Sequence, residues 1–119
     1  MFLFSRRPTR LTPLQARRRT TDGDAVLLDV REQAEWDAGH APGAVHAPLS
    51  RLVTGAPLPT AAEDRQLVVI CRSGHRSRQA AKLLTGRGAQ AVDVAGGMTA
   101  WAAAGLPVVD ERGTRGLVT

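Results

Sequence analysis

The chain has 119 residues, 43% of them hydrophobic and 23% charged, which fits one soluble globular domain with an ordinary core. Its aromatic residues are two Trp, two Phe and no Tyr, too few for stacking on nucleic-acid bases, so no nucleic-acid partner is expected. The single cysteine excludes an internal disulfide and fits a reducing compartment, which predicts a cytoplasmic protein.

The positive charge is concentrated at the N-terminus. Six arginines precede the first acidic residue, Asp22, whereas residues 22–119 carry 10 basic and 11 acidic side chains, a net charge of −1. We therefore expect a basic N-terminal segment at 1–9, whose simplest interpretation is a solvated tail. No apolar run approaches the roughly 18 residues of a membrane span, so no membrane span is expected.

Helical and strand-type patterns alternate along the sequence. Unbroken apolar runs such as Ala25–Leu28 and Leu67–Ile70 are typical of strands covered on both faces, and Thr12-Pro13 has the pattern of a helix start. In chain order we expect a helix over 12–19, a strand over 25–28, a helix over 33–38, a strand over 44–46, a strand over 67–70, a helix over 78–85, a strand over 90–94 and a short helix that carries Trp101. Residues 105–109 then close the core, and 111–119 form a loose C-terminal tail.

This alternation predicts an α/β fold, in which a mainly parallel sheet has helices on both faces. Ligands of such sheets bind beyond the carboxyl ends of the strands. Cys71, the only cysteine, directly follows the apolar strand at 67–70. Fold and chemistry therefore indicate the same place for a functional site.

The residues after Cys71 are typical of a loop that holds negative charge. Gly74 permits backbone conformations that turn successive N–H groups inward, and the helix beyond the loop adds its positive end. The loop also supplies two hydroxyls, with Ser77 placed to cap the following helix, and two permanent positive charges. These side chains are Ser73, Ser77, Arg72 and Arg76. Such surroundings favour the thiolate, which is the reactive form of cysteine, so Cys71 is the candidate nucleophile.

The spacing between the cysteine and the second arginine separates two chemistries. Cysteine-dependent phosphatases use Cys-x5-Arg, a loop wide enough for a tetrahedral phosphate, whereas four residues separate Cys71 from Arg76. A tighter ring suits one additional sulfur atom, carried as a persulfide, better than a phosphoryl group. A phosphatase or arsenate-reductase activity is therefore the less favoured alternative.

Three motifs, in this order, resemble the rhodanese-like sulfurtransferase family. They are Asp29–Ala44, similar to D-V-R-x-x-x-E-[FWY]-x-x-G-H-[IA]-x-G-A, Cys71–Ser77, similar to C-x-x-G-x-R-S, and Gly96–Trp101, similar to G-G-x-x-x-W. The resemblance covers about residues 11–109 and implies a rhodanese-like domain at 10–110. Its expected fold has three layers, α/β/α, around a central, mainly parallel five-stranded sheet.

The resemblance implies a transfer of sulfur in two steps. Cys71 takes the outer sulfur of a donor such as thiosulfate, and the persulfide passes it to an acceptor, either cyanide or a thiol. No metal or organic cofactor is implied. Arg72 resembles the arginine of thiosulfate-using members, although Ser73 stands where the well-known thiosulfate enzyme has a lysine. The candidate substrate-binding residues are Arg72, Ser73, Gly74, His75, Arg76 and Ser77.

A second function of a different class stays open. The protein would then be a persulfide carrier that hands sulfur to an accepting protein and turns over small molecules slowly.

Other polar residues receive structural interpretations. Asp29 and Arg31 follow a strand end, where we expect a charge pair or hydrogen-bond anchor that supports the neighbouring loop. His75 is interpreted as a loop residue whose backbone N–H matters more than its ring. His40 and His46 lack a metal-ligand spacing with the cysteine, so no metal site is expected.

Overall fold

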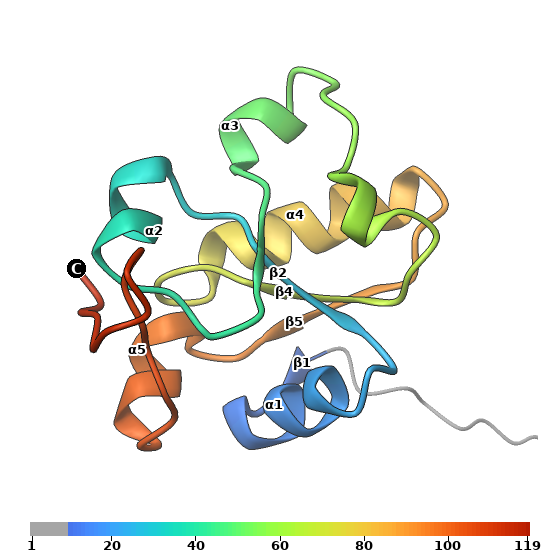
Figure 1. Ribbon diagram of the computed structural model, residues 1–119. Helices are drawn as coiled ribbons and strands as arrows, with labels where there is room; N and C mark the ends of the chain where they lie inside the picture. Colours follow the sequence, from blue (N-terminus) through green and yellow to red (C-terminus); the bar gives the residue numbers. More distant parts are fainter. Residues whose placement is uncertain (1–9) are drawn as a thin grey trace, which may run out of the picture.

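The computed structural model describes residues 10–119, and the basic segment expected at 1–9 lies outside the described residues. Its helices surround a five-stranded sheet (Figure 1). The elements are β1 (Arg10–Leu11), α1 (Pro13–Thr21), β2 (Val26–Asp29), α2 (Gln33–Ala38), β3 (Val45–His46), α3 (Leu49–Leu52), the 3₁₀ helix η1 (Thr60–Ala62), β4 (Leu67–Ile70), α4 (His75–Gly86), β5 (Ala91–Val94) and α5 (Gly97–Ala103). The strand order is β1-β5-β4-β2-β3, and every neighbouring pair is parallel. The expected α/β/α fold is confirmed.

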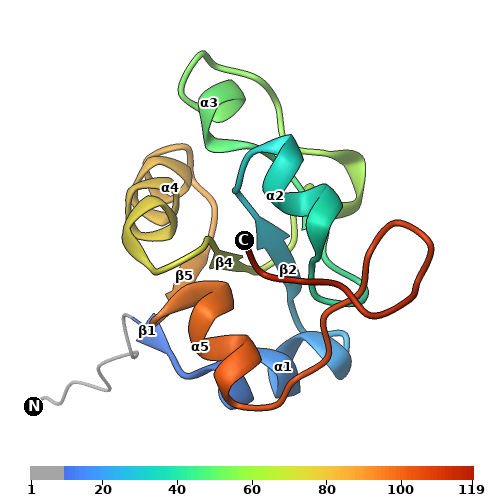
Figure 2. The same ribbon diagram turned by 90° about the vertical axis from the view of Figure 1, so that its left-hand side faces the viewer.

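The alternation of side chains along β4 builds the two halves of the core. Leu67 and Val69 pack with residues of α3 and α4, whereas Val68 and Ile70 pack with residues of α1 and α5. Figure 2 shows these two helical layers on opposite sides of the strands. Because successive side chains of a strand point to opposite faces, Cys71 falls on the α3 and α4 side, in line with Leu67 and Val69.

The start of α4 and the presence of β1 differ from the sequence expectations. Helix α4 begins at His75, three residues before the expected start, because Gly74 has a φ of 103° and turns the chain directly into the helix. Gly74 is the N-cap, so Ser77 lies within the first turn and does not cap the helix as expected. Strand β1 was not expected, since two residues are too few to leave a periodic pattern.

The C-terminal residues do not form the loose tail that the sequence predicts for 111–119. The N–H of Leu117 donates to the carbonyl of Ala38 at 2.9 Å, and Val109 and Arg115 form an antiparallel bridge. Gly39 is packed so closely that a Cβ there would lie 2.6 Å from the Leu117 nitrogen. The segment therefore covers the end of α2, as Figure 2 shows.

None of the helices within residues 10–119 has the length and apolar character needed to cross a bilayer.

Candidate active site

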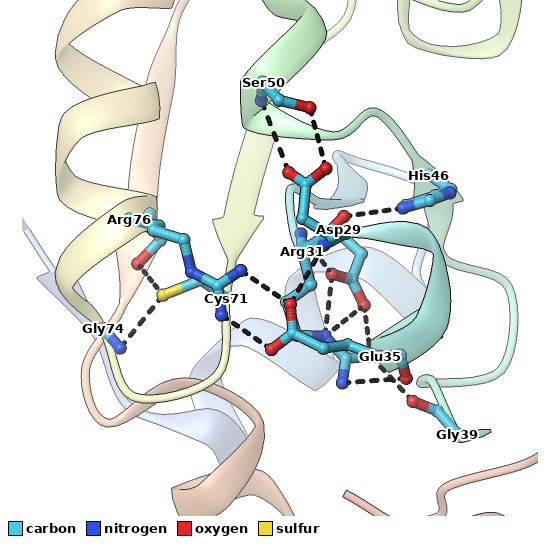
Figure 3. A network of polar contacts seen from close by, with 11 residues as sticks. Asp29, Arg31, Glu35, Gly39, His46, Ser50, Cys71, Gly74 and Arg76 are labelled. Carbon is cyan, nitrogen blue, oxygen red and sulfur yellow. Dashed lines mark hydrogen bonds and ion pairs between the residues drawn. The ribbon is translucent and has the colours of Figure 1, made fainter. Parts of the chain in front are cut away.

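Cys71 lies at the carboxyl end of β4, and the chain after it curves around the sulfur and leads into α4 (Figure 3). The N–H of Gly74 donates to its Sγ at an N···S distance of 3.1 Å, and the thiol lies 3.4 Å from Ser77 Oγ. The sequence predicts a ring of inward-pointing backbone amides around the sulfur. Among residues 71–77 of the structure, the Gly74 N–H donates a hydrogen bond to the sulfur and the other amides do not. The residue is 1% exposed, so the thiol is almost completely shielded from solvent.

The first turn of α5 fixes the backbone on which the thiol is carried. The N–H of Met98 donates to the Cys71 carbonyl at 2.7 Å, and that of Thr99 donates to the Arg72 carbonyl at 2.9 Å. Gly97 permits this approach, since its φ is +55° and a Cβ there would lie 2.7 Å from the carbonyl carbon and oxygen of Arg72. Gly97, the second glycine of the third sequence motif, therefore allows α5 to hold the loop of the second motif in place.

Arg76 is paired with Glu35 of α2. Its Nη1 and Nη2 each lie 2.7 Å from a different carboxylate oxygen of Glu35 (Figure 3). These hydrogen bonds raise the pKa of Arg76 and lower the pKa of Glu35 from its ordinary value of 4.5. The sequence analysis predicts that Arg72 and Arg76 both bind an anionic ligand. In the structure, Glu35 already neutralises the charge of Arg76.

Three side chains of the loop face solvent. Arg72, Ser73 and His75 are exposed, and Ser73 Oγ lies 3.4 Å from the Nδ1 of His75. None of the three ion pairs found among residues 10–119 involves Arg72. Its charge is therefore the one at the rim of the loop that is available to a negatively charged ligand.

Asp29 and Arg31 form a fully buried ion pair at the end of β2, the strand next to β4. Their side chains are 0% exposed and meet at 2.7 Å. Arg31 also donates to the carbonyls of Gly39 at 2.7 Å and Glu35 at 3.3 Å, so it holds α2 in place. Since Asp29 is paired with Ile70 in the sheet, this anchor lies directly beside the end of β4.

His40 of the first motif and His46, which follows that motif, both stack on Trp36. The ring centroids of His40 and His46 lie 3.6 and 4.7 Å from that of Trp36. Each ring also bonds to a backbone carbonyl, His40 to Trp36 at 2.8 Å and His46 to Arg31 at 2.7 Å. Among the described residues, no three His, Cys, Asp or Glu side chains gather in a way that could hold a metal ion.

Two residues that the sequence reasoning missed complete the site. Asp93 of β5 accepts a hydrogen bond from Ser77 Oγ at 2.9 Å, and Arg10 of β1 pairs with Asp93 at 3.0 Å. The hydrogen bond to Asp93 raises the pKa of Arg10. An acidic residue inside the apolar run Ala91–Val94 is a signal that could have identified Asp93. Arg10 leaves no such signal, because its place depends on the pairing of β1 with β5.

The fold and the site together define a small α/β domain with a thiol loop at the carboxyl edge of a parallel sheet. The sequence model of the rhodanese-like domain family matches residues 12–104. A sulfurtransferase from Allochromatium vinosum is 37% identical over 92 residues, which cover 76% of this chain and 83% of that protein. The chain belongs to the rhodanese-like sulfurtransferase family.

Solved structures with the same fold include small and large proteins. A rhodanese-related protein from Thermoplasma volcanium superposes with a TM-score of 0.74 at 30% identity, over 86% of this chain and 98% of that chain. The thiosulfate sulfurtransferase from Pseudomonas aeruginosa superposes with a TM-score of 0.71 at 25% identity. That match covers 96% of this chain but 22% of the larger protein.

Proposed function

We propose that the protein moves a sulfane sulfur from a donor such as thiosulfate to cyanide or a thiol through a persulfide on Cys71. The observation that carries this proposal is the Gly74 N–H, which lies 3.1 Å from the sulfur at the start of the 12-residue helix α4. A fixed donor and a helix N-terminus at one sulfur atom favour negative charge on it. Membership of a family that contains sulfurtransferases supports the same reaction class.

The proposed cycle needs no external oxidant or reductant. The Cys71 thiolate attacks the outer sulfur of thiosulfate, a new S–S bond forms, and sulfite leaves with the electron pair of the bond that breaks. Cyanide or a thiolate then attacks the outer sulfur of the persulfide, and the Cys71 thiolate leaves. Each step is a displacement at sulfur, so the covalent intermediate divides one transfer into two easier ones.

The loop residues receive distinct roles in this proposal. Arg72 captures the anionic donor at the rim, where Ser73 and His75 are also exposed. Gly74 stabilises the charged sulfur through its N–H, and the Ser77 hydroxyl contacts the same atom. Because Cys71 is 1% exposed, the donor enters when the exposed part of the loop opens.

Two residue pairs support that loop without contacting the substrate. The pair Glu35–Arg76 fixes the start of α4, and the pair Asp29–Arg31 supports it from β2. A cytoplasmic location forms part of the proposal, and the free thiol of Cys71 supports it.

Formation of thiocyanate from thiosulfate and cyanide tests this function. We expect turnover in the wild type and none in Cys71→Ser. Arg78→Ala, which changes an exposed residue of α4 beyond the loop, serves as the purification control and should keep wild-type turnover. Thiocyanate formation that persists in Cys71→Ser would refute the proposal.

A persulfide carrier for a protein partner is the second candidate. Two observations favour it: the thiol is buried, and Arg76 is occupied by Glu35, so that recognition of a small anion rests on Arg72. A carrier would hold the extra sulfur but form thiocyanate slowly, and it would release the sulfur to an accepting protein. Stable loading of Cys71 with negligible thiocyanate formation would favour this candidate over the first.

A further inference from the structure

A closed set of hydrogen bonds surrounds the sulfur of Cys71. The thiol contacts Ser77 Oγ, which donates to Asp93 Oδ2 at 2.9 Å. Arg10 donates to both oxygens of Asp93, through Nε at 3.1 Å and Nη2 at 3.0 Å. The same Nη2 donates to the Gly74 carbonyl at 2.9 Å, and the Gly74 N–H returns to the sulfur. Arg10 therefore connects to the sulfur by two routes.

The hydroxyl of Ser77 has one proton, and this proton is used by Asp93. In that orientation Ser77 can only accept a hydrogen bond from the sulfur, which suits a protonated thiol. To stabilise a thiolate, the hydroxyl has to turn from Asp93 to the sulfur. The Ser77 hydroxyl turns more easily when Asp93 is a weaker hydrogen-bond acceptor. Arg10 weakens Asp93 as an acceptor because it donates to both carboxylate oxygens.

Burial makes this competition significant. Ser77 is 0% exposed and Asp93 is 2% exposed, so water does not replace a hydrogen bond that either of them loses. Hydrogen bonds to charged groups are stronger in such an environment than in water.

We propose that Arg10, Asp93 and Ser77 are positioning residues that set the ionisation of Cys71, with the Ser77 hydroxyl reversing its hydrogen bond when the thiol loses its proton. The proton leaves to solvent, the O–H of Ser77 turns to the thiolate, and Asp93 keeps its two bonds to Arg10. The inference deepens the proposed function and rests on it for the role of Cys71 as nucleophile.

Other charged groups also surround the loop and remain the same in every variant below. These groups are Arg72 and His75 of the loop and the start of α4, Arg76 of α4 with Glu35 of α2, Asp29 with Arg31 at the end of β2, and the exposed Arg51 of α3. Helix α5 carries no charged residue. Differences between variants therefore report the change that is made at Arg10, Asp93 or Ser77.

The composition of the chain makes the thiolate directly measurable. Cys71 is the only cysteine and there is no tyrosine, so the ultraviolet absorbance that develops as the pH rises belongs to the thiolate, with Cys71→Ser as baseline. Ser77→Ala removes a donor to the thiolate, and we expect the pH midpoint of the absorbance change to rise by roughly one unit. Asp93→Ala releases the Ser77 hydroxyl, and we expect the midpoint to fall by roughly half a unit to one unit.

The double variant Ser77→Ala/Asp93→Ala distinguishes this route from a simple charge effect. If Asp93 acts through Ser77, its removal changes the midpoint of the Ser77→Ala protein by less than about 0.3 pH unit. An equal fall in both backgrounds means that Asp93 acts only as a charge, which overturns the proposal. An unchanged midpoint in Ser77→Ala overturns it as well.

Arg10→Gln gives a second route if the Asp93 variants do not fold, since the side chain of Arg10 is 33% exposed. Without the guanidinium, Asp93 accepts the hydrogen bond from Ser77 more strongly, so we expect the pH midpoint of the thiolate absorbance to rise. A fall in this midpoint would contradict the proposal. The absorbance needs no sulfur donor. If the midpoints follow these expectations but the protein transfers no sulfur, the proposed function is wrong and this inference still holds.

Discussion

Glu35 and Arg76 meet through two parallel hydrogen bonds of 2.7 Å, although 41 positions separate them in the sequence. The pair joins α2, which follows β2, to α4, which follows β4. Arg31 donates to the backbone carbonyl of Glu35, so the first motif holds one end of the pair and the cysteine loop holds the other. Arg76, the arginine at the end of the cysteine loop, is therefore held between the first and the second motif. Kinetic measurements can distinguish its role from that of Arg72.

Arg72→Ala should raise the KM for thiosulfate by about 3–10-fold, because the Arg72 charge is exposed and engaged in none of the ion pairs of residues 10–119. The double variant Glu35→Gln/Arg76→Ala removes a compensated pair as a unit and should leave the KM close to that of the wild type. Steady-state kinetics at low ionic strength, where exposed charges act most strongly, gives both values. A larger KM change in the double variant than in Arg72→Ala would place the donor against Arg76 and contradict the assignment.

The Glu35–Arg76 pair should contribute a pH-dependent part of the stability. Its hydrogen bonds lower the pKa of Glu35, so the stabilisation is present above the ordinary value of 4.5 and is lost as the pH falls through the lower value of the folded protein. Both side chains are partly exposed, so we expect about 0.5–1 kcal/mol.

Urea unfolding of the wild type and of Glu35→Gln at about pH 6.5 and about pH 3 measures this contribution. The difference between the two proteins should shrink at the lower pH. The exposed Glu63 provides the matched control, Glu63→Gln. A difference that stays constant with pH would show that the ion pair does not act in this way.

Gly97→Ala should destabilise the protein by about 2–4 kcal/mol, because it adds a left-handed backbone strain to a collision with the Arg72 carbonyl. Gly105→Ala is the matched control, since Gly105 also has a positive φ, +77°, but a Cβ there would meet nothing within 4 Å. That variant should lose about 1–2 kcal/mol. Chemical unfolding measures both values, and equal losses would mean that the close packing of α5 on the loop is unimportant.

The central strands and the place of the thiol could be predicted from the sequence. Parallel strands that are covered on both faces leave unbroken apolar runs, and Leu67–Ile70 is such a run, with Cys71 directly after it. The burial of the thiol was not predicted, because it depends on α4 lying over the face to which Leu67 and Val69 point.

The partners of the charged groups could not be predicted. A sequence gives the number of arginines and carboxylates but not which of them meet, so it predicts a ligand as the partner of Arg76, whereas the structure pairs Arg76 with Glu35. The position of Ser77 depends on one backbone angle, the φ of 103° at Gly74, which starts α4 early and turns the hydroxyl to Asp93 instead of the helix end. Arg10 enters the site through a strand of two residues.

The central claim is that Cys71 carries one additional sulfur atom, and intact-mass analysis after incubation with thiosulfate tests it most directly. The account predicts a gain of about 32 Da in the wild type, its removal by cyanide, and no gain in Cys71→Ser. An unchanged mass in the wild type, or the same gain in Cys71→Ser, would contradict it.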